Sequence, residues 1–386
     1  MSDSVTDTAV ATTPQAGTAE PVQEDRISVA RQRQLIWWRF RKHKLALIAA
    51  IVVVVFYFVA VFADFFAYSA PNAADGRRAL VPPQSISWFD GNGFNPHVHP
   101  LELSRDPATL QVHYAPNQNK NIPVRLFATG YPYKVLGLIP TDIHLIGTRG
   151  GPAESSLFLL GTDDQGRDIF SRLIVASRTS LFIGLAGVTL SLLLGILFGG
   201  LSGFYGGVVD LVIQRIIEVM RSIPTIPLWM GLGAALPKNW SVTKTYLAIT
   251  IIISVIGWAE MARVVRGRIL QVRGEDFITA AELVGARPRR IIFVHLIPLF
   301  ISYIIAATTL ALPQMIIAET SLSFLGLGLH SPAVSWGVML QSAQNVQSIA
   351  LSPWMLLPVV PVVLAILAFN FVGDGLRDAA DPYQSS

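Results

Sequence analysis

Residues 274–298 read GEDFITAAELVGARPRRIIFVHLIP and lie between two long apolar stretches. Their first half predicts a short helix over Asp276–Val284, and Gly285 is expected to end it because glycine permits a sharp turn with positive φ. A second helix is expected to begin near Pro288, since proline suits the first turn of a helix. The small pair Ala280–Ala281 lets another surface approach closely. The pattern therefore predicts a helix–turn–helix that docks against another protein.

The apolar stretches on either side belong to a chain with the composition of a membrane protein. Of its 386 residues, 52% are hydrophobic and 14% are charged, whereas soluble domains have about 25% charged residues. A membrane-spanning helix needs about 20 predominantly apolar residues. Six segments predict an all-α integral membrane protein with six transmembrane helices: Leu45–Ala63, Thr179–Val209, Leu211–Leu236, Thr245–Ala262, Ile291–Ala318 and Trp354–Val372.

Glycine and proline predict irregularities in two of these segments. The second segment is too long for one span, so a turn is expected within it at Gly203–Gly207. Pro224 and Pro227 are expected to kink the third, because proline removes a backbone donor and its ring clashes with the preceding turn.

Positive charge predicts how the six helices are oriented. Residues 31–44 hold six Arg and Lys and no acid, and residues 263–290 hold seven Arg against three acids. Short loops rich in Lys and Arg stay on the cytoplasmic side of a membrane. Six spans place both segments on the same side, so both the N- and the C-terminus are expected in the cytoplasm.

These features predict four regions along the chain. Residues 1–30 are expected to form a disordered cytoplasmic tail, because a polar, acidic stretch cannot bury enough apolar surface to fold. Residues 31–65 are expected to form a basic entry segment and the first helix. Residues 171–386 are expected to form a transmembrane domain with helices 2–6 and the cytoplasmic loop 263–298. Residues 66–170 are then an extracytoplasmic insertion between helices 1 and 2.

Residues 274–298 resemble the EAA coupling motif of permease subunits of bacterial ABC importers, nearest to the C-type branch of dipeptide and oligopeptide permeases. Thr279 stands where many such loops have glutamate, and Leu299 where this branch often has asparagine. Ile291 also falls in register with the pattern of this branch. In that family this segment couples the permease to an ATPase. The resemblance implies this coupling role for nine residues: Glu275, Asp276, Ala280, Ala281, Gly285, Ala286, Ile292, His295 and Pro298. Further segments that resemble this branch are Trp38–Leu47, Leu160–Leu173, Ser321–Gly328 and Gly373–Asp378.

The resemblance implies a channel-forming subunit, not an enzyme, in the bacterial cytoplasmic membrane. Its expected partners are a second homologous permease, two ATPase subunits, an extracytoplasmic solute-binding protein and the lipid bilayer, with no nucleic acid. The chain has no G-x-x-x-x-G-K-[ST] phosphate loop. ATP and Mg²⁺ are therefore expected on the ATPase subunits, and no cofactor or metal on this chain. The absence of cysteine excludes disulfides and thiol chemistry.

Dipeptides and oligopeptides are the solutes that the resemblance favours, and oligosaccharides or nickel are alternatives within the family. An ion-coupled secondary transporter is an alternative of another class, with Glu260 or Glu319 as a proton site. A membrane-anchored receptor with a ligand-binding insertion is a third. Both carboxylates are candidates for a solute path, because charge within a membrane is costly. Both also stand near predicted membrane interfaces, where hydration lowers that cost.

Two charged clusters are interpreted as structural. The first is expected to pair along one helical face, with a gate or a subunit contact as its alternative role; it consists of Arg215, Glu218 and Arg221. The second is interpreted as turn capping and ion pairing before the second span, rather than as a metal or acid–base site; it consists of Asp163, Asp164, Arg167 and Asp168.

The 66–170 insertion is expected to be partly β, with strands in the runs Val124–Thr129 and Ser156–Leu160 between turn residues. It is too long for a plain connector. A docking surface for a substrate receptor, a lid, and a decoration without a direct role all remain open as interpretations. His97 and His99 are interpreted as exposed loop histidines, because two histidines without a third ligand make a weak metal site.

Overall fold

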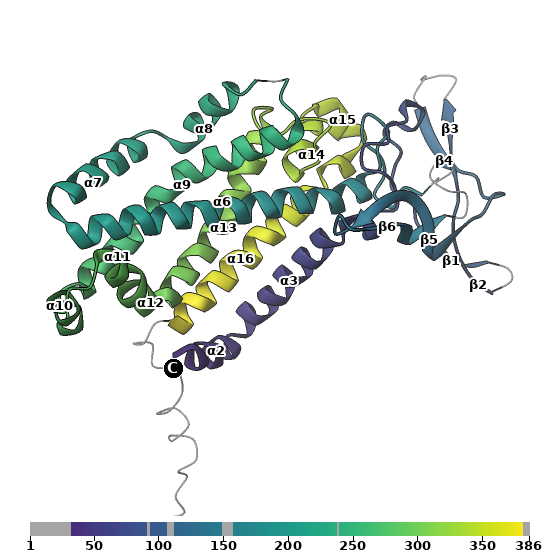
Figure 1. The fold of residues 1–386 in the computed structure, drawn as a ribbon. Coiled ribbons are helices and arrows are strands. Elements are labelled where there is room, and N and C mark those ends of the chain that lie inside the picture. Colours follow the sequence, from purple (N-terminus) through teal and green to yellow (C-terminus); the bar gives the residue numbers. More distant parts are fainter. Residues whose placement is uncertain (1–31, 91–92, 106–111, 149–156, 238, 381–386) are drawn as a thin grey trace, which may run out of the picture.

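The computed structural model describes residues 32–90, 93–105, 112–148, 157–237 and 239–380. The tail expected over residues 1–30 lies outside this part of the chain. A bundle of long helices forms most of the described structure, and a small β region covers one end of it (Figure 1).

Five stretches in the described residues are long and apolar enough to cross a membrane. The longest, α6, has 37 residues and extends about 55 Å at 1.5 Å per residue. A bilayer core is about 30 Å thick, so part of α6 must protrude from it. The five are α3 (Lys44–Val61), α6 (Ile169–Tyr205), α9 (Val242–Val272), α13 (Ile301–Phe324) and Pro353–Ala380, which comprises η3 (Pro353–Leu356) and α16 (Val359–Ala380).

The third expected span is divided into two helices rather than kinked. Its first part is α7 (Gly207–Ser222) and its second is α8 (Thr225–Ala234), and neither is long enough alone to cross a membrane. The break follows from Pro224, which disfavours helical backbone in the preceding residue; Ile223 is extended, at φ −91° and ψ 127°. The turn expected before this span is confirmed at Gly206, whose φ is +65°.

Small residues on α6 bring it close to α9. A Cβ added at Gly195 would lie 2.6 Å from Met261, and one added at Gly199 would lie 2.4 Å from the carbonyl oxygen of Ala262. These positions have no room for a larger residue. Packing through small side chains is how membrane helices approach one another closely. The glycines therefore make α6 and α9 the central pair of the bundle (Figure 1).

The fifth expected span is also interrupted. The chain runs through α11 (Pro288–Arg290), a π-helix η2 (Ile291–Leu296) and α12 (Ile297–Leu299) before α13 starts. Pro298 has no backbone N–H and its ring clashes with the carbonyl four residues earlier, which accounts for the widened helix before it. The long helix of the expected span Ile291–Ala318 therefore begins at Ile301 rather than at Ile291.

The first and last helices of the described residues, α2 and α16, meet at one end of the bundle (Figure 1). The N-terminal helix α2 (Gln32–Lys42) packs on α16 through a small cluster that includes Phe40, Ala46 and Ala379. α10 (Asp276–Leu283) lies at this same end. The opposite end holds α14 (Trp336–Ser342), α15 (Val346–Leu351) and the β region.

The β region contains two antiparallel sheets, one of four strands in the order β1-β2-β5-β6 and one formed by β3 and β4. Val124–Thr129 lies in a strand as expected. Of the second expected strand, Ser156–Leu160, Ser156 lies outside the described residues, and the other four residues do not form a strand, because they enter a turn that ends at Gly161 with φ +79°. The short helices α4 (Ala63–Phe66) and η1 (Gly76–Arg78) precede the sheets. The strands are β1 (Ser87–Asp90), β2 (Gly93–Val98), β3 (Leu101–Arg105), β4 (Val112–Pro116), β5 (Ile122–Val135) and β6 (Ile139–Thr148).

Candidate coupling site

The α10 helix ends as its sequence predicts. Its last turn is closed by a 3.0 Å bond from the N–H of Ala286 to the oxygen of Ala281, and a 2.9 Å bond from the N–H of Gly285 to the oxygen of Glu282. This pair of bonds is the Schellman arrangement, and it needs left-handed backbone at the residue after the cap. Gly285 supplies that backbone, at φ +84°. The predicted break is confirmed.

One side chain anchors α10 to the rest of the molecule. Ile278 is 1% exposed and belongs to a cluster with Ile269 of α9 and Ile291 of η2. The outer face of the helix is apolar and uncovered, with Leu283 84% exposed and Val284 89% exposed. The helix therefore has one buried anchor and exposed apolar side chains on its opposite face.

The residues that the motif singles out divide between these two faces. Four are exposed on or beside α10: Glu275, Asp276, Ala280 and Gly285. Two are half-buried behind it: Ala281 and Ala286. In the following segment, Ile292 is buried, His295 is half-buried and Pro298 is exposed. Ile292 reaches α6, where a Cβ at Gly200 would lie 3.3 Å from its Cγ2.

A charged pair that the sequence reading missed joins two helices at the same end. Arg266 of α9 donates to both oxygens of Asp210 of α7, from Nε to Oδ1 and from Nη2 to Oδ2, each at 2.6 Å. Arg273 donates from Nη1 to the carbonyl oxygen of Gly203 at 3.1 Å. In the sequence, Asp210 is a single acidic residue after a glycine turn, and this pattern does not indicate its partner. These contacts tie the segment before α10 to α6 and α7.

The ion-pair ladder expected on one helical face is only partly present. Arg215 and Glu218 pair at 2.6 Å. Arg221 does not continue the ladder, because its Nη1 lies 2.7 Å from Oε2 of Glu260 on α9. The Glu260 side chain is 68% exposed. The pair therefore bridges α7 and α9 at a surface.

Glu319 of α13 lies in a different environment from the hydrated interface that was expected. It is 0% exposed, and its carboxylate accepts hydrogen bonds from Ser180 of α6 at 3.0 Å and from Ser323 at 2.9 Å. Each of these hydroxyls also accepts a backbone N–H, from Trp336 at 3.2 Å and from Leu329 at 3.1 Å. The carboxylate thus holds α6, α13 and the start of α14 together.

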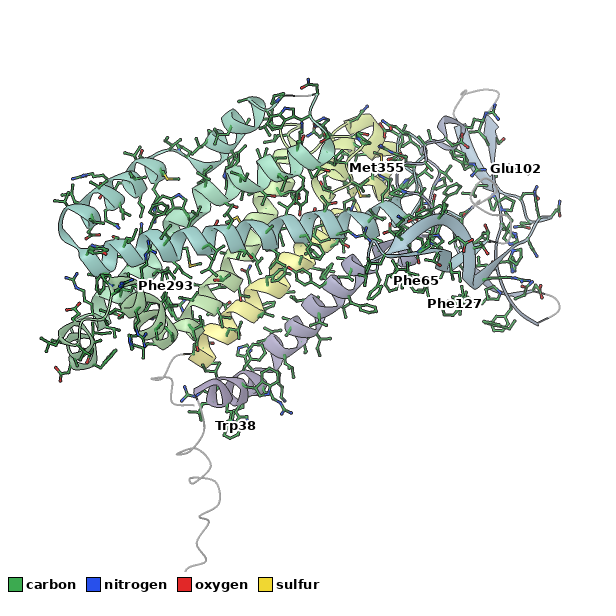
Figure 2. The ribbon with its side chains drawn as sticks, in the orientation of Figure 1. Trp38, Phe65, Glu102, Phe127, Phe293 and Met355 are labelled. Carbon is green, nitrogen blue, oxygen red and sulfur yellow. The ribbon has the colours of Figure 1, made fainter. Side chains whose placement is uncertain are left out.

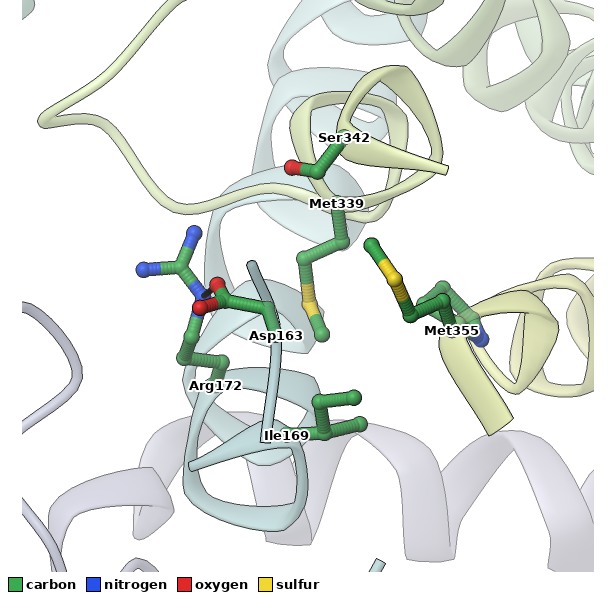
Figure 3. Close-up of a pocket in the computed structure, with 7 residues that line it drawn as sticks. Asp163, Ile169, Arg172, Met339, Ser342 and Met355 are labelled. Atoms are coloured by element: carbon green, nitrogen blue, oxygen red, sulfur yellow. Dashed lines mark ion pairs between the residues drawn. The ribbon is translucent and has the colours of Figure 1, made fainter. Parts of the chain in front are cut away.

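A second polar cluster lies at the N-terminal end of α6, where capping and ion pairing were expected. Asp163 pairs with Arg167 at 2.7 Å and approaches Arg172 at 3.7 Å. Figure 3 shows Asp163 and Arg172 side by side in a pocket with Met339 and Met355. The pocket encloses about 10 Å³, which is room for about one water molecule. It is therefore too small for a solute.

Asp168 caps the first turn of α6 and confirms the capping interpretation. Its side chain accepts the N–H of Ser171 at 2.7 Å and the hydroxyl of Tyr68 at 2.8 Å. Burial raises the pKa of Asp168 to about 6, although both hydrogen bonds act in the opposite direction. Burial also raises the pKa of Tyr68 well above its ordinary value.

His97 is not the exposed loop residue that was expected. It lies in β2, is 3% exposed, and its Nδ1 is 2.7 Å from the carbonyl oxygen of Asn95. The half-buried His99 packs edge-on against it, with ring centroids 5.1 Å apart. Among the described residues, no group of three potential metal ligands includes them.

Family models match two parts of the chain. Residues 192–385, which include α10 and the Glu319 carboxylate, match the binding-protein-dependent transport system inner membrane component. Residues 31–83 match the N-terminal transmembrane domain of oligopeptide transport permease C. The chain is a member of this permease family.

Known permeases resemble the chain over different shares of its length. The oligopeptide transport system permease protein OppC of Bacillus subtilis is 30% identical over 371 residues, which are 95% of this chain and 94% of that protein. OppC of Haemophilus influenzae is 36% identical over 63% of this chain and 75% of its own length. The dipeptide permease DppC of Bacillus subtilis is 38% identical over 58% of this chain and 68% of its own length.

A solved structure is also similar to part of this permease. It is a chain of the MetNI methionine ABC transporter in inward-facing conformations, with 18% identity and a TM-score of 0.43. The match covers 54% of this chain and 96% of that one.

Proposed function

We propose that this permease couples ATP hydrolysis on partner subunits to solute import, and that α10 is the helix that docks onto an ATPase subunit. The supporting observation is the open apolar face of α10, where Leu283 and Val284 are more than four-fifths exposed. Exposed apolar patches mark sites of protein contact. Glu275 and Asp276 lie at the start of this face, and the arginines around Pro288 lie beyond its end.

The split helix α7–α8 is the sixth crossing in this proposal. Its start adjoins Gly206, at the end of the bundle where Arg273 contacts Gly203. Its far end lies at the opposite end, where a Cβ at Gly233 would be 2.6 Å from the carbonyl oxygen of Leu327, just past α13. Six crossings place α2, α10 and the C-terminus together in the cytoplasm, in accord with the positive charge of residues 31–44 and 263–290. The β region then lies outside.

The proposed solutes are peptides, and oligopeptides are preferred to dipeptides. The match to the oligopeptide permease extends over 95% of this chain, so it takes in most of residues 66–170. The match to the Bacillus dipeptide permease covers 58%. A long external region shared with the oligopeptide relative favours that solute class. Oligosaccharides and nickel remain the alternatives within the family.

An ion-coupled mechanism is disfavoured by the surroundings of its two candidate proton sites. Glu319 is enclosed by hydroxyl groups that hold three elements together, which suits a structural role better than a solute path. Glu260 is exposed and paired with Arg221.

The complete importer would contain a second permease, two ATPase subunits and an external binding protein, with ATP and Mg²⁺ held by the ATPases.

Cysteine labelling tests the docking of α10, since the chain has no cysteine of its own. We expect Leu283→Cys to react with a water-soluble maleimide in the isolated permease and to be protected in the assembled complex. Val208→Cys is the control, because Val208 is 77% exposed at the same end but lies on α7. Equal reactivity of Leu283→Cys in both states would exclude α10 as the docking helix.

Uptake by the reconstituted importer tests the solute. We expect ATP-dependent accumulation of a labelled pentapeptide that is reduced by excess unlabelled oligopeptide. Excess nickel and excess oligosaccharide serve as competing solutes. Uptake driven by an ion gradient without ATP would overturn the coupling mechanism, and competition by oligosaccharide alone would overturn the peptide assignment.

A further inference from the structure

The hairpin between β5 and β6 ends in an unusually apolar tip. Leu136 is 63% exposed, Leu138 is 80% exposed and Ile139 is 65% exposed, and only Gly137 separates the first two. Hairpin turns in water usually carry polar residues. Three exposed large apolar side chains within four residues point to a surface that something apolar covers.

The backbone conformation of this tip makes leucine at position 136 unexpected. Leu136 has φ +52° and Gly137 has φ +73°, the two positive angles of a tight hairpin turn that favours Asn-Gly. Leucine is strained in this left-handed conformation. Asparagine would relieve that strain and suit water, so an apolar side chain here is explained by an apolar environment.

The tip lies beside two membrane helices. It borders an open hollow of about 270 Å³ whose walls include Val61 at the end of α3 and Phe182 within α6. Lys134 and Arg178 line the same hollow, and Arg178 pairs with Asp64 at 2.7 Å. Apolar groups beside basic side chains are the arrangement of a membrane interface, where long basic side chains reach the phosphate level.

An aromatic path joins this side of the sheet to the exposed face of α3. Phe58, 55% exposed on α3, contacts Phe66 with ring centroids 6.0 Å apart. Phe66 contacts Phe65 at 5.5 Å, and Phe65 contacts Phe127 of β5 at 6.3 Å. Figure 2 shows Phe65 and Phe127 adjacent where α4 meets the sheet. Phe127 is 65% exposed and also has a positive φ, +54°.

We propose that the hairpin tip Leu136–Ile139 is seated in the outer leaflet of the bilayer, with phospholipid as its occupant. The lipid-facing surface of α3 continues through the aromatic path to β5, so the sheet rests on the membrane through this hairpin. Lys134 then stands at the level of the lipid phosphates, where basic groups are attracted to anionic headgroups. This inference rests on the membrane orientation in the proposed function.

Spin labels on single cysteines test the proposal in the assembled importer, reconstituted in phospholipid nanodiscs. Three variants are compared: Leu138→Cys at the tip, Phe58→Cys on α3 as the lipid reference, and Leu103→Cys on β3 as the water reference. Leu103 is an exposed apolar residue of the same external region, at 56%. We expect the label at 138 to collide more with oxygen than with a water-soluble nickel chelate, as at 58 and unlike at 103.

The failures of this inference and of the proposed orientation are distinguishable. A label at 138 that collides with the chelate as often as at 103, while 58 stays lipid-exposed, would overturn the inference alone. Protection at 138 from both reagents would also overturn it, because that result marks a protein partner. Chelate access at 58 would instead overturn the membrane crossing of α3.

Discussion

The Glu319 carboxylate and the α10 helix are attached to the helical bundle in opposite ways. At the proposed outer end of the bundle, the buried carboxylate of Glu319 accepts hydrogen bonds from hydroxyl groups on two helices, and Asp163 pairs with buried Arg167. At the proposed cytoplasmic end, α10 is attached through one buried isoleucine and a short hydrophobic cluster. Its opposite face is exposed.

The contrast fits a subunit that receives motion at one end and holds its shape at the other. Charge-assisted hydrogen bonds in a buried site are strong and directional, so they resist rearrangement. A helix with few buried apolar contacts can shift or open locally at low cost. We therefore expect substitutions at the outer end to affect folding, and substitutions at α10 to affect coupling.

The largest expected effect is at Glu319. Glu319→Ala leaves Ser180 and Ser323 without their acceptor and creates a cavity, so we expect a loss of about 3 kcal/mol or more in the free energy of unfolding. The thermal unfolding midpoint in nanodiscs measures it. Glu260→Ala is the matched control, because an exposed ion pair contributes about 0–1 kcal/mol. Equal losses of stability in the two variants would show that the buried Glu319 carboxylate stabilises the fold no more than the exposed Glu260 carboxylate.

The second prediction concerns pH at the outer end. The pKa of Asp168 is about 6 in the folded chain against an ordinary 3.8, so the folded state holds this proton more tightly than the unfolded state. Its contribution to stability is full below pH 3.8 and is lost as the pH rises to about 6. The loss is roughly 3 kcal/mol at most, at about 1.4 kcal/mol per pKa unit.

Asp168→Asn removes this titration. Unfolding midpoints of the parent and the variant, measured between pH 4 and pH 6.5, are therefore expected to diverge, with the parent losing more stability as the pH rises. Parallel pH profiles for the two proteins would show that Asp168 does not titrate in this range.

The third prediction removes the anchor of α10. Ile278→Ala deletes a side chain that is 1% exposed, which costs about 2 kcal/mol or more. We expect faster amide hydrogen exchange over residues 276–284 and reduced ATP-dependent uptake, with the outer end unchanged. Phe277→Ala is the control, since Phe277 is 44% exposed: it alters the docking face and should leave exchange unchanged. Faster exchange throughout the bundle would contradict a local anchor.

The smallest expected effect isolates one backbone angle. Gly285→Ala meets no atom within 4 Å but must adopt φ +84°, which costs roughly 1 kcal/mol. Gly274→Ala also meets no atom, and its φ is not in the left-handed region. We expect only the first variant to lower uptake and loosen α10. Equal uptake by both would show that the turn geometry at Gly285 is not needed for coupling.

Local structure was the part that the sequence predicted best. The bounds of α10, the turn at Gly206 and the cap at Asp168 were each expected from the residues themselves. The physical reason is that caps, glycine turns and proline breaks depend on backbone geometry within a few residues. The apolar runs likewise placed the long helices, because their burial or lipid exposure depends on composition.

Tertiary structure decided the surroundings of each charge. Glu260 and Glu319 had the same sequence description, a carboxylate at the end of an apolar run, yet one is exposed and the other is fully enclosed. Arg221 pairs across 39 residues rather than with its helical neighbour.

These outcomes depend on which helix faces pack against each other. The residues next to a charge along the chain do not determine that packing. The sequence by itself therefore determined a membrane protein with a short helix after Gly274 that ends at a glycine turn. Only the packing of α6, α7, α9 and α13 decided which of its charges hold the outer end together and which remain at the surface.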